Sequence, residues 1–214
     1  RYRWTGALAT TTSFAWQSGL TPGKHSIERW DPAKVDGVGL TSGQLPPVMP
    51  GYQRVGILQE ELVRETGLPR GTWFMAGTTP VAARLWLACE PTPGQRIIML
   101  DQSGARGWRV VAGSDFDESV AGALPAPHGD HWYLPETDSV ADPRKGDAPD
   151  PEAIYDSADD ASALDWDVDA DHVHVSADFA QPSRGPALLA GVGLGWFKDM
   201  KPFWRKRCPI QTLA

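Results

Sequence analysis

The sequence has little of what defines several broad classes of protein. Only two of its 214 residues are cysteines, Cys89 and Cys208, which excludes a scaffold held by several disulfides and predicts reduced thiols. No apolar run approaches the roughly 20 residues of a membrane-spanning helix, so we expect no membrane partner. Lys and Arg number 20 against 27 acidic residues, and the net charge of −7 disfavours a nucleic-acid partner.

The sequence also begins without methionine and without the pattern of a secretory leader. It opens on RYRW, which indicates the middle of a strand and predicts a fragment or a processed product. A chain with no leader pattern and few cysteines is expected in the cytoplasm. Its apolar fraction of 41% and charged fraction of 22% are typical of a globular protein of one or two domains.

Hydrophobic patterning predicts short helices and strands. A helix is expected over Gln59–Thr66, with Gly67 as its stop, and another over Val81–Ala88. A buried strand is expected at Trp73–Ala76. A further strand is expected at Arg96–Leu100, with the following segment GWRVVAGS as its hairpin partner.

The composition changes in the second half. Residues 136–171 carry recurrent aspartates and prolines, which predict an acidic flexible loop or linker. The segment DHVHVSADF alternates like a strand, and RGPALLAGVGLG predicts a glycine-rich helix that packs closely, followed by a basic tail. His172 and His174 could ligate a divalent metal beside nearby aspartates, or could face solvent on an edge strand. No third ligand has motif spacing, so no metal site is predicted.

Four segments, in order along the chain, resemble the FGGY family of carbohydrate kinases, which includes xylulose, glycerol and ribulose kinases. They are RYRWTGALATTTSFAW, LPPVMPGYQRVGIL, TGLPRGTWFMAG and SRGPALLAGVGLGWFKD. The resemblance implies an α/β protein with a partial actin-like (ribonuclease H-like) ATPase fold and a long acidic loop. Members of that family transfer a phosphoryl group from ATP to a sugar or polyol held between two domains, so ATP and Mg²⁺ are the cofactors implied for an active member.

On this resemblance the chain divides into four parts. Residues 1–78 resemble the C-terminal part of a first FGGY-like domain, and residues 79–135 the start of a second. Residues 136–171 are the acidic loop or linker, and residues 172–214 the C-terminal strand and glycine-rich helix with its basic tail. The family's N-terminal strand-turn-strand has no counterpart, and the acidic stretch stands in place of most of the second domain, including its glycine-rich adenosine segment. The expected partners are therefore a sugar or polyol, and a partner chain or missing N-terminal half.

The family's catalytic loop reads Gly-Gly-x-Asp-x-x-Ala, and its aspartate accepts the proton of the sugar hydroxyl. The corresponding loop here runs from Gly77 to Ala83 and puts Pro80 in the place of that base, so no catalytic residue is predicted. The family's phosphate turn, Gly-Thr-Ser-Gly, corresponds to DQSG at residues 101–104. The resemblance implies phosphate contacts from Gly77, Thr78, Thr79, Ser103 and Gly104.

Three functions remain open as hypotheses. The first is a divergent or truncated relative of ATP-dependent sugar kinases that is inactive as this chain alone. The second is a non-catalytic carbohydrate-binding or scaffold module derived from that family. The third is an RNA-binding module of a CRISPR effector, suggested by a Pro-Gly segment before a helix and by the GVGLG loop. The net acidity and the lack of an aromatic and basic stripe argue against the third.

Overall fold

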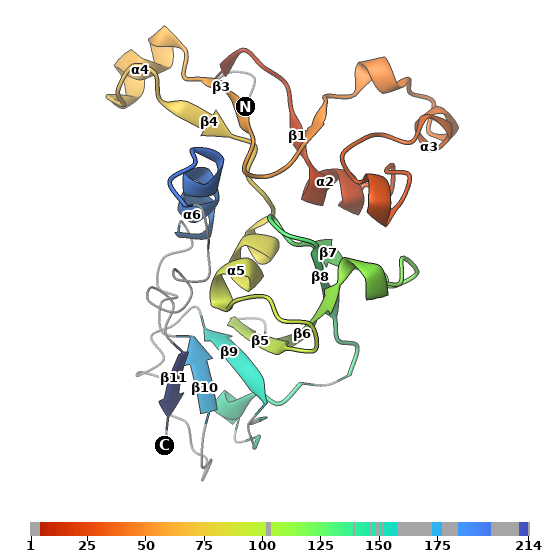
Figure 1. The fold of residues 1–214 in the computed structure, drawn as a ribbon, viewed down its shortest axis with the longest axis vertical. Helices are drawn as coiled ribbons and strands as arrows, with labels where there is room; N and C mark the ends of the chain where they lie inside the picture. Colours follow the sequence, from red (N-terminus) through yellow and green to blue (C-terminus); the bar gives the residue numbers. More distant parts are fainter. Residues whose placement is uncertain are drawn as a thin grey trace. The chain divides into compact units, whose positions relative to one another are not determined.

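The chain folds into two compact units, and each is described by itself (Figure 1). The computed structural model describes residues 5–101, 104–138, 140–145, 147–148, 150, 152–157, 173–176, 184–197 and 210–213. The first unit comprises residues 1–79, 127–129 and 186–198, and the second comprises residues 80–126, 130–185 and 199–214. Each unit is therefore assembled from segments that are far apart in the sequence.

Short elements make up the first unit. Its helices are α2 (Thr12–Gln17), α3 (Pro32–Gly37), α4 (Glu60–Thr66) and α6 (Arg184–Gly193), with 3-10 turns η1 (Lys24–Ser26) and η2 (Ser42–Gln44). Strands β1 (Thr10–Thr11) and β2 (Val48–Met49) pair in parallel, and β3 (Arg54–Ile57) and β4 (Trp73–Met75) pair antiparallel. The predicted helix before Gly67 is confirmed, because α4 ends where the Gly67 amide donates to the Val63 carbonyl over 3.0 Å.

Helix α6 confirms the predicted glycine-rich helix and its close packing. Any side chain at Gly193 would collide with the carbonyl oxygen of Tyr52 and with the Met75 side chain. A side chain at Gly191 would collide in the same way with the Phe197 ring. Gly193 thus lets the helix backbone lie directly against Tyr52 and against Met75 of β4, and Gly191 lets the Phe197 ring lie against the helix.

A seven-stranded mixed sheet forms the second unit, in the order β11-β10-β9-β5-β6-β8-β7 (Figure 1). The strands are β5 (Arg96–Asp101), β6 (Gly104–Ala112), β7 (Leu124–Pro125), β8 (His131–Pro135), β9 (Ala153–Ser157), β10 (Val173–Ser176) and β11 (Ile210–Leu213), with 3-10 turns η3 (Gly113–Asp115) and η4 (Pro143–Lys145). Strands β5, β6 and β8 pair antiparallel, while β9 and β10 run parallel to β5. The expected α/β class and the expected hairpin after Arg96 are confirmed.

Helix α5 (Pro80–Ala88) covers one face of this sheet. Its buried side chains include Leu85 and Trp86, and Arg84 reaches the Asp156 carboxylate on β9. The apolar core of the sheet includes Ile97 and Val110, which are fully buried. The predicted helix at residues 81–88 is confirmed and begins one residue earlier than expected.

Three expectations need correction. A strand, β9, lies inside the acidic stretch 136–171 that was expected to be a loop, because its residues bury against β5 and β10. Strand β10 was considered as an edge strand, but β9 and β11 pair with its two sides, and β11 occupies part of the predicted basic tail. Strand β4 was expected to be buried, yet Trp73 is 41% exposed, with the Arg54 guanidinium 4.9 Å from its ring centroid.

Candidate functional site

The connection between β4 and α5 includes a loop formed by Gly77, Thr78 and Thr79. The Gly77 amide donates to the carbonyl of Gly51 over 2.7 Å, and its φ of 74° is a conformation that glycine adopts without strain. Just before it, the Ala76 amide donates to the Gln53 carbonyl over 2.8 Å. Backbone bonds to the segment 51–53 therefore fix the path of the loop.

Side-chain hydroxyls hold the other side of this loop. Ser13 of α2 and Thr78 share a hydrogen bond of 2.7 Å between their hydroxyl oxygens. Ser13 is only 1% exposed and Thr79 only 5% exposed. Thr11 caps α2 by accepting from the Phe14 amide over 3.3 Å, which orients the first turn that carries Ser13. The loop thus presents neutral hydroxyl groups that are themselves hydrogen-bonded.

Pro80, which the resemblance places at the position of the catalytic base, is the first residue of α5. Proline suits the start of a helix, because its fixed φ is helical and its missing N–H would have no partner there. Its ring carries no group that accepts a proton. The chemistry of the loop is therefore hydrogen bonding by hydroxyls and amides, which suits hydroxyl or phosphate oxygens better than a divalent metal.

The predicted phosphate turn joins β5 to β6 in the second unit. The backbones of Asp101 and Gly104 pair across it, and Gly104 has a φ of 123° that glycine alone adopts readily. Lys145 of η4 lies beside this turn, with its Nζ 4.0 Å from the position that a Cβ on Gly104 would occupy. This ammonium group also lies 3.6 Å from the Asp142 carboxylate. Sequence reasoning missed Lys145, because nothing local links it to a turn some 40 residues earlier.

The five predicted phosphate-binding residues do not all fall in one described unit. Gly77, Thr78 and Thr79 lie together in the first unit, and Gly104 belongs to the second. Ser103 lies outside the described residues. The structure thus brings three of the five together.

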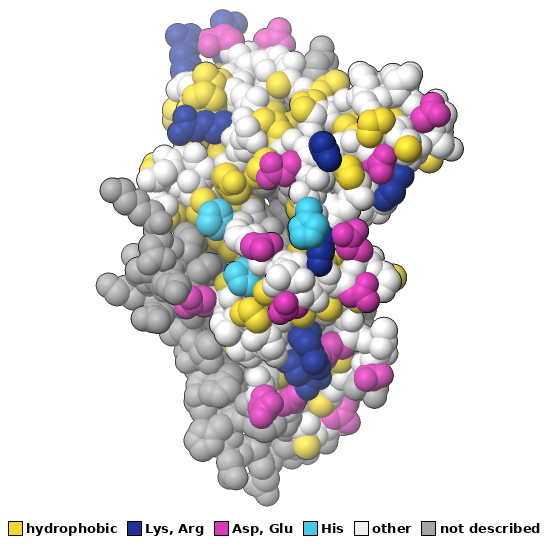
Figure 2. Space-filling model, turned by 45° about the vertical axis from the view of Figure 1, so that its right-hand side comes forward, with side chains coloured by type: hydrophobic (Ala, Val, Ile, Leu, Met, Phe, Trp, Pro, Cys, Tyr) yellow, Lys and Arg dark blue, Asp and Glu magenta, His cyan; other side chains and the backbone are white. Residues whose placement is uncertain are grey.

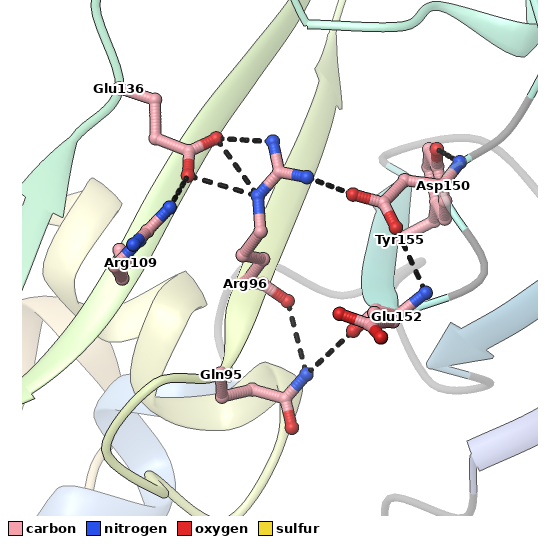
Figure 3. A network of polar contacts seen from close by, with 7 residues as sticks. All are labelled: Gln95, Arg96, Arg109, Glu136, Asp150, Glu152 and Tyr155. Carbon is pink, nitrogen blue, oxygen red and sulfur yellow. Dashed lines mark hydrogen bonds and ion pairs between the residues drawn. The ribbon is translucent and has the colours of Figure 1, made fainter.

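A polar network on the second unit joins the sheet to the acidic stretch (Figure 3). Arg96 of β5 binds Glu136 through Nε and Nη2, at 2.9 and 2.7 Å, and its Nη1 pairs with Asp150. The Asp150 amide donates to the Tyr155 hydroxyl over 2.8 Å. The Arg96 hydrogen bond lowers the pKa of Glu136, and burial raises the pKa of Tyr155 to about 12. The network keeps Glu136 ionised and fixes the start of the acidic stretch on the sheet.

Among the residues that the structure describes, no group of three or more His, Cys, Asp or Glu side chains could hold a metal ion. His172 lies outside those residues, and His128 instead packs edge-on against Tyr52, with ring centroids 5.3 Å apart. Burial lowers the pKa of His128. Cys89 is a buried cysteine.

The described surface carries both charge signs. Figure 2 shows Lys and Arg side chains interspersed with Asp and Glu on the face that it presents. None of the described helices combines the length and the apolarity that crossing a lipid bilayer requires.

Solved carbohydrate kinases share the fold of this chain. The ligand-bound xylulose kinase from Lactobacillus acidophilus matches all of the chain with a TM-score of 0.70 and 13% sequence identity. The gluconate kinase from the same organism also matches all of it, with a TM-score of 0.68 and 12% identity. The xylulose kinase from Rhodospirillum rubrum matches 63% of the chain, with a TM-score of 0.52 and 17% identity.

These likenesses are structural, because no family model and no curated protein matches the sequence. The chain spans 60% of the length of each Lactobacillus protein and 27% of the length of the Rhodospirillum protein. The chain is therefore similar to a part of the actin-like fold of sugar kinases, and the predicted fold class is confirmed.

Proposed function

We propose that this chain is a divergent relative of the ATP-dependent sugar kinases that does not itself transfer a phosphoryl group. The observation that carries the proposal is the loop, where Ser13 and Thr78 share a hydrogen bond and Pro80 begins the helix. Hydroxyl groups do not ionise near neutral pH, so they cannot accept the proton of a sugar hydroxyl as a carboxylate does. A kinase-like fold without a base at this position has lost one of the groups that phosphoryl transfer uses.

The loop nevertheless has groups that suit binding, and non-catalytic recognition of a sugar or polyol is the role that we assign to it. Its hydroxyls and amides match the donors and acceptors of a polyhydroxylated ligand. The position of Lys145 beside Gly104 favours a second candidate, retained binding of a nucleotide phosphate at the turn of the second unit. An ammonium beside such a turn offsets the negative charge of a phosphate.

Thermal unfolding with a ligand panel and an assay of ADP release test both roles. We expect pentuloses, hexuloses, gluconate or glycerol to raise Tm, because a ligand that binds only the folded state stabilises it by about 3 kcal/mol at a hundred times its Kd. We expect no sugar-dependent ADP release. Stabilisation by Mg-ATP alone would favour the nucleotide role, and turnover on any of these sugars would overturn the proposal.

Substitutions test whether the ligand-dependent rise in Tm arises at the loop. Thr78→Val should abolish the sugar-dependent rise in Tm, because it removes a hydroxyl from the site. Thr72→Val is the matched control in the same unit, since the Thr72 hydroxyl donates to the nearby carbonyl of Pro69 over 2.7 Å and lies outside the loop. Pro80→Asp should restore no turnover, because the turn at residues 101–104 also departs from the family pattern.

A further inference from the structure

An ion pair beneath helix α5 is unusual in being buried and only half satisfied. Asp156 of β9 is 0% exposed. Its Oδ2 accepts a hydrogen bond from Nε of Arg84 over 3.0 Å, and Nη2 of Arg84 lies 2.7 Å from the same oxygen as an ion pair. Its other oxygen, Oδ1, is buried with no hydrogen-bond partner among the described residues. Nη2 of Arg84 is also buried with no hydrogen-bond partner among the described residues, because its hydrogen atoms are not directed at Oδ2. Among the described residues, Arg84 therefore donates one hydrogen bond to this carboxylate, whereas an arginine–carboxylate pair commonly forms two.

Such a pair is a weak source of stability. A buried carboxylate loses its hydration, and replacing a buried ion pair by apolar residues is often neutral or stabilising. Burial raises the pKa of Asp156 to about 6, and Arg84 opposes that rise through its charge and its hydrogen bond. The folded state therefore takes up a proton at this site only a little below neutral pH. The side chain of Arg84 is 24% exposed, so its guanidinium has a short route to water.

We propose that Arg84 and Asp156 form a proton-controlled latch, which holds α5 on the sheet while Asp156 is ionised and releases Arg84 to solvent when Asp156 is protonated. Arg84 favours the ionised carboxylate, so a state in which Arg84 has left while Asp156 stays buried binds the proton more tightly. By linkage, proton binding then shifts the population towards that state. This inference does not depend on the proposed function.

The latch acts on the helix that begins directly after the loop. Arg84 lies one helical turn after Pro80, the first residue of α5, and Thr79 of the loop immediately precedes that residue. The Arg84–Asp156 pair connects this first turn to β9, whereas the contacts of Leu85 and Trp86 with the core are apolar. Release of the pair therefore loosens the N-terminal half of α5.

Other titratable groups on this face do not change charge in the same way. Arginine stays protonated throughout the neutral range, and burial raises the pKa of Tyr133 well above its ordinary value. The backbone of His174 on β10 pairs with Ile154 on β9, two residues before Asp156, so a His174 variant is included among the tests. Arg84 reaches Asp156 from α5. Strand register places Arg106 of β6 in line with Asp156 through Met99 of β5, and it places His174 of β10 two residues away.

Hydrogen exchange measured by mass spectrometry on the full chain tests the latch. After correction for intrinsic rates, peptides from residues 80–88 should be about tenfold less protected at about pH 5 than at about pH 7.5. The midpoint should coincide with the titration of the Asp156 carboxyl carbon followed by NMR. Asp156→Asn should show low protection of α5 at both pH values. The β5–β6 hairpin, residues 96–112, serves as the internal reference for global unfolding.

Three further variants make the outcome decisive. Arg84→Gln should raise the titration midpoint of Asp156 and remove the pH dependence of hydrogen exchange in α5. If Asp156→Asn does not fold, the result for Arg84→Gln is sufficient to test the proposal. Glu60→Gln, which breaks the exposed pair with Arg70, should leave the pH dependence intact. His174→Gln should also leave it intact. The proposal is overturned if α5 of the unmodified chain exchanges independently of pH, if Arg84→Gln retains the pH dependence, or if His174→Gln abolishes it.

Discussion

Gly51 lies where the segment 51–53, the loop and helix α6 meet in the first unit. A Cβ at this position would be 2.6 Å from the carbonyl oxygen of Gly77 and 2.9 Å from Leu189 Cδ2. The first of these atoms is backbone, so no change of rotamer relieves the collision. Gly51→Ala is therefore expected to lower the free energy of unfolding by about 2 kcal/mol, as overpacking does in a closed site.

Urea unfolding followed by circular dichroism measures this effect, and Gly43→Ala is the matched control. No atom lies within 4 Å of a Cβ at Gly43, so this change should alter the free energy of unfolding by less than about 0.5 kcal/mol. Equal effects of the two changes would show that the close approach of Gly51 to the loop does not contribute to stability.

The identities of the loop residues follow from the sequence, but their partners do not. Gly77, Thr78 and Pro80 can be located by their order after a predicted strand. The bond between Ser13 and Thr78 joins residues 65 positions apart, and no local pattern connects them. Asp156 is harder still to anticipate, because an aspartate within an acidic stretch ordinarily indicates a solvated position. Its burial results from long-range strand pairing.

At the scale of elements, the sequence predicted the helices and strands whose ends are marked by nearby residues. A glycine stop defines α4, and the hairpin of β5 and β6 joins two apolar runs through a polar turn. Strand β9 has no such signal, since aspartates and prolines flank its five residues, AIYDS. It forms because β5 and β10 pair with it on both sides. In this segment, pairing with neighbouring strands determines the secondary structure, and local propensity and composition do not.

The Arg96 network provides a prediction for the acidic stretch. Glu136→Gln should lower the free energy of unfolding by about 2 kcal/mol, because a largely buried hydrogen bond between two charged groups is lost. Chemical denaturation near neutral pH measures the change. Glu60→Gln is the control, because the exposed Arg70–Glu60 pair should contribute less than about 0.5 kcal/mol.

The effect of Glu136→Gln on the free energy of unfolding should change with pH in a defined direction. Glu136 has a pKa below its ordinary value of 4.5, chiefly through the Arg96 hydrogen bond, so it stabilises the fold above that pH. The stabilisation is lost as the pH falls through the lowered pKa. Glu136→Gln should therefore approach the stability of the unmodified chain as the pH falls below the lowered pKa of Glu136. A destabilisation that did not change as the pH fell would assign the effect of the substitution to packing and not to charge.

At the scale of the whole molecule, each unit consists of several segments that are separated in the sequence. The segment 172–214, which the sequence predicts to be one C-terminal part, contributes α6 to the first unit and β10 and β11 to the second. A linear division of the sequence cannot represent this arrangement, because the packing of α6 depends on contacts with residues more than 100 positions earlier. Gly193 against Tyr52, and Leu189 near Gly51, are those contacts.

This discontinuity leads to a prediction about fragments. Residues 5–79 alone leave the α6-facing sides of Tyr52 and Met75 uncovered, and their two-stranded sheet of β3 and β4 is marginal without a covering helix. We expect this fragment to show no cooperative urea transition. The same fragment joined through a flexible Gly-Ser linker to residues 184–197 should regain one, because the linker lets α6 dock. A linked fragment carrying Gly193→Val controls for the mere presence of the helix, since its side chain would collide with Tyr52. Either of two results would show that the first unit does not require α6. One is cooperative unfolding of residues 5–79 alone, and the other is equally cooperative unfolding of the linked fragments with and without Gly193→Val.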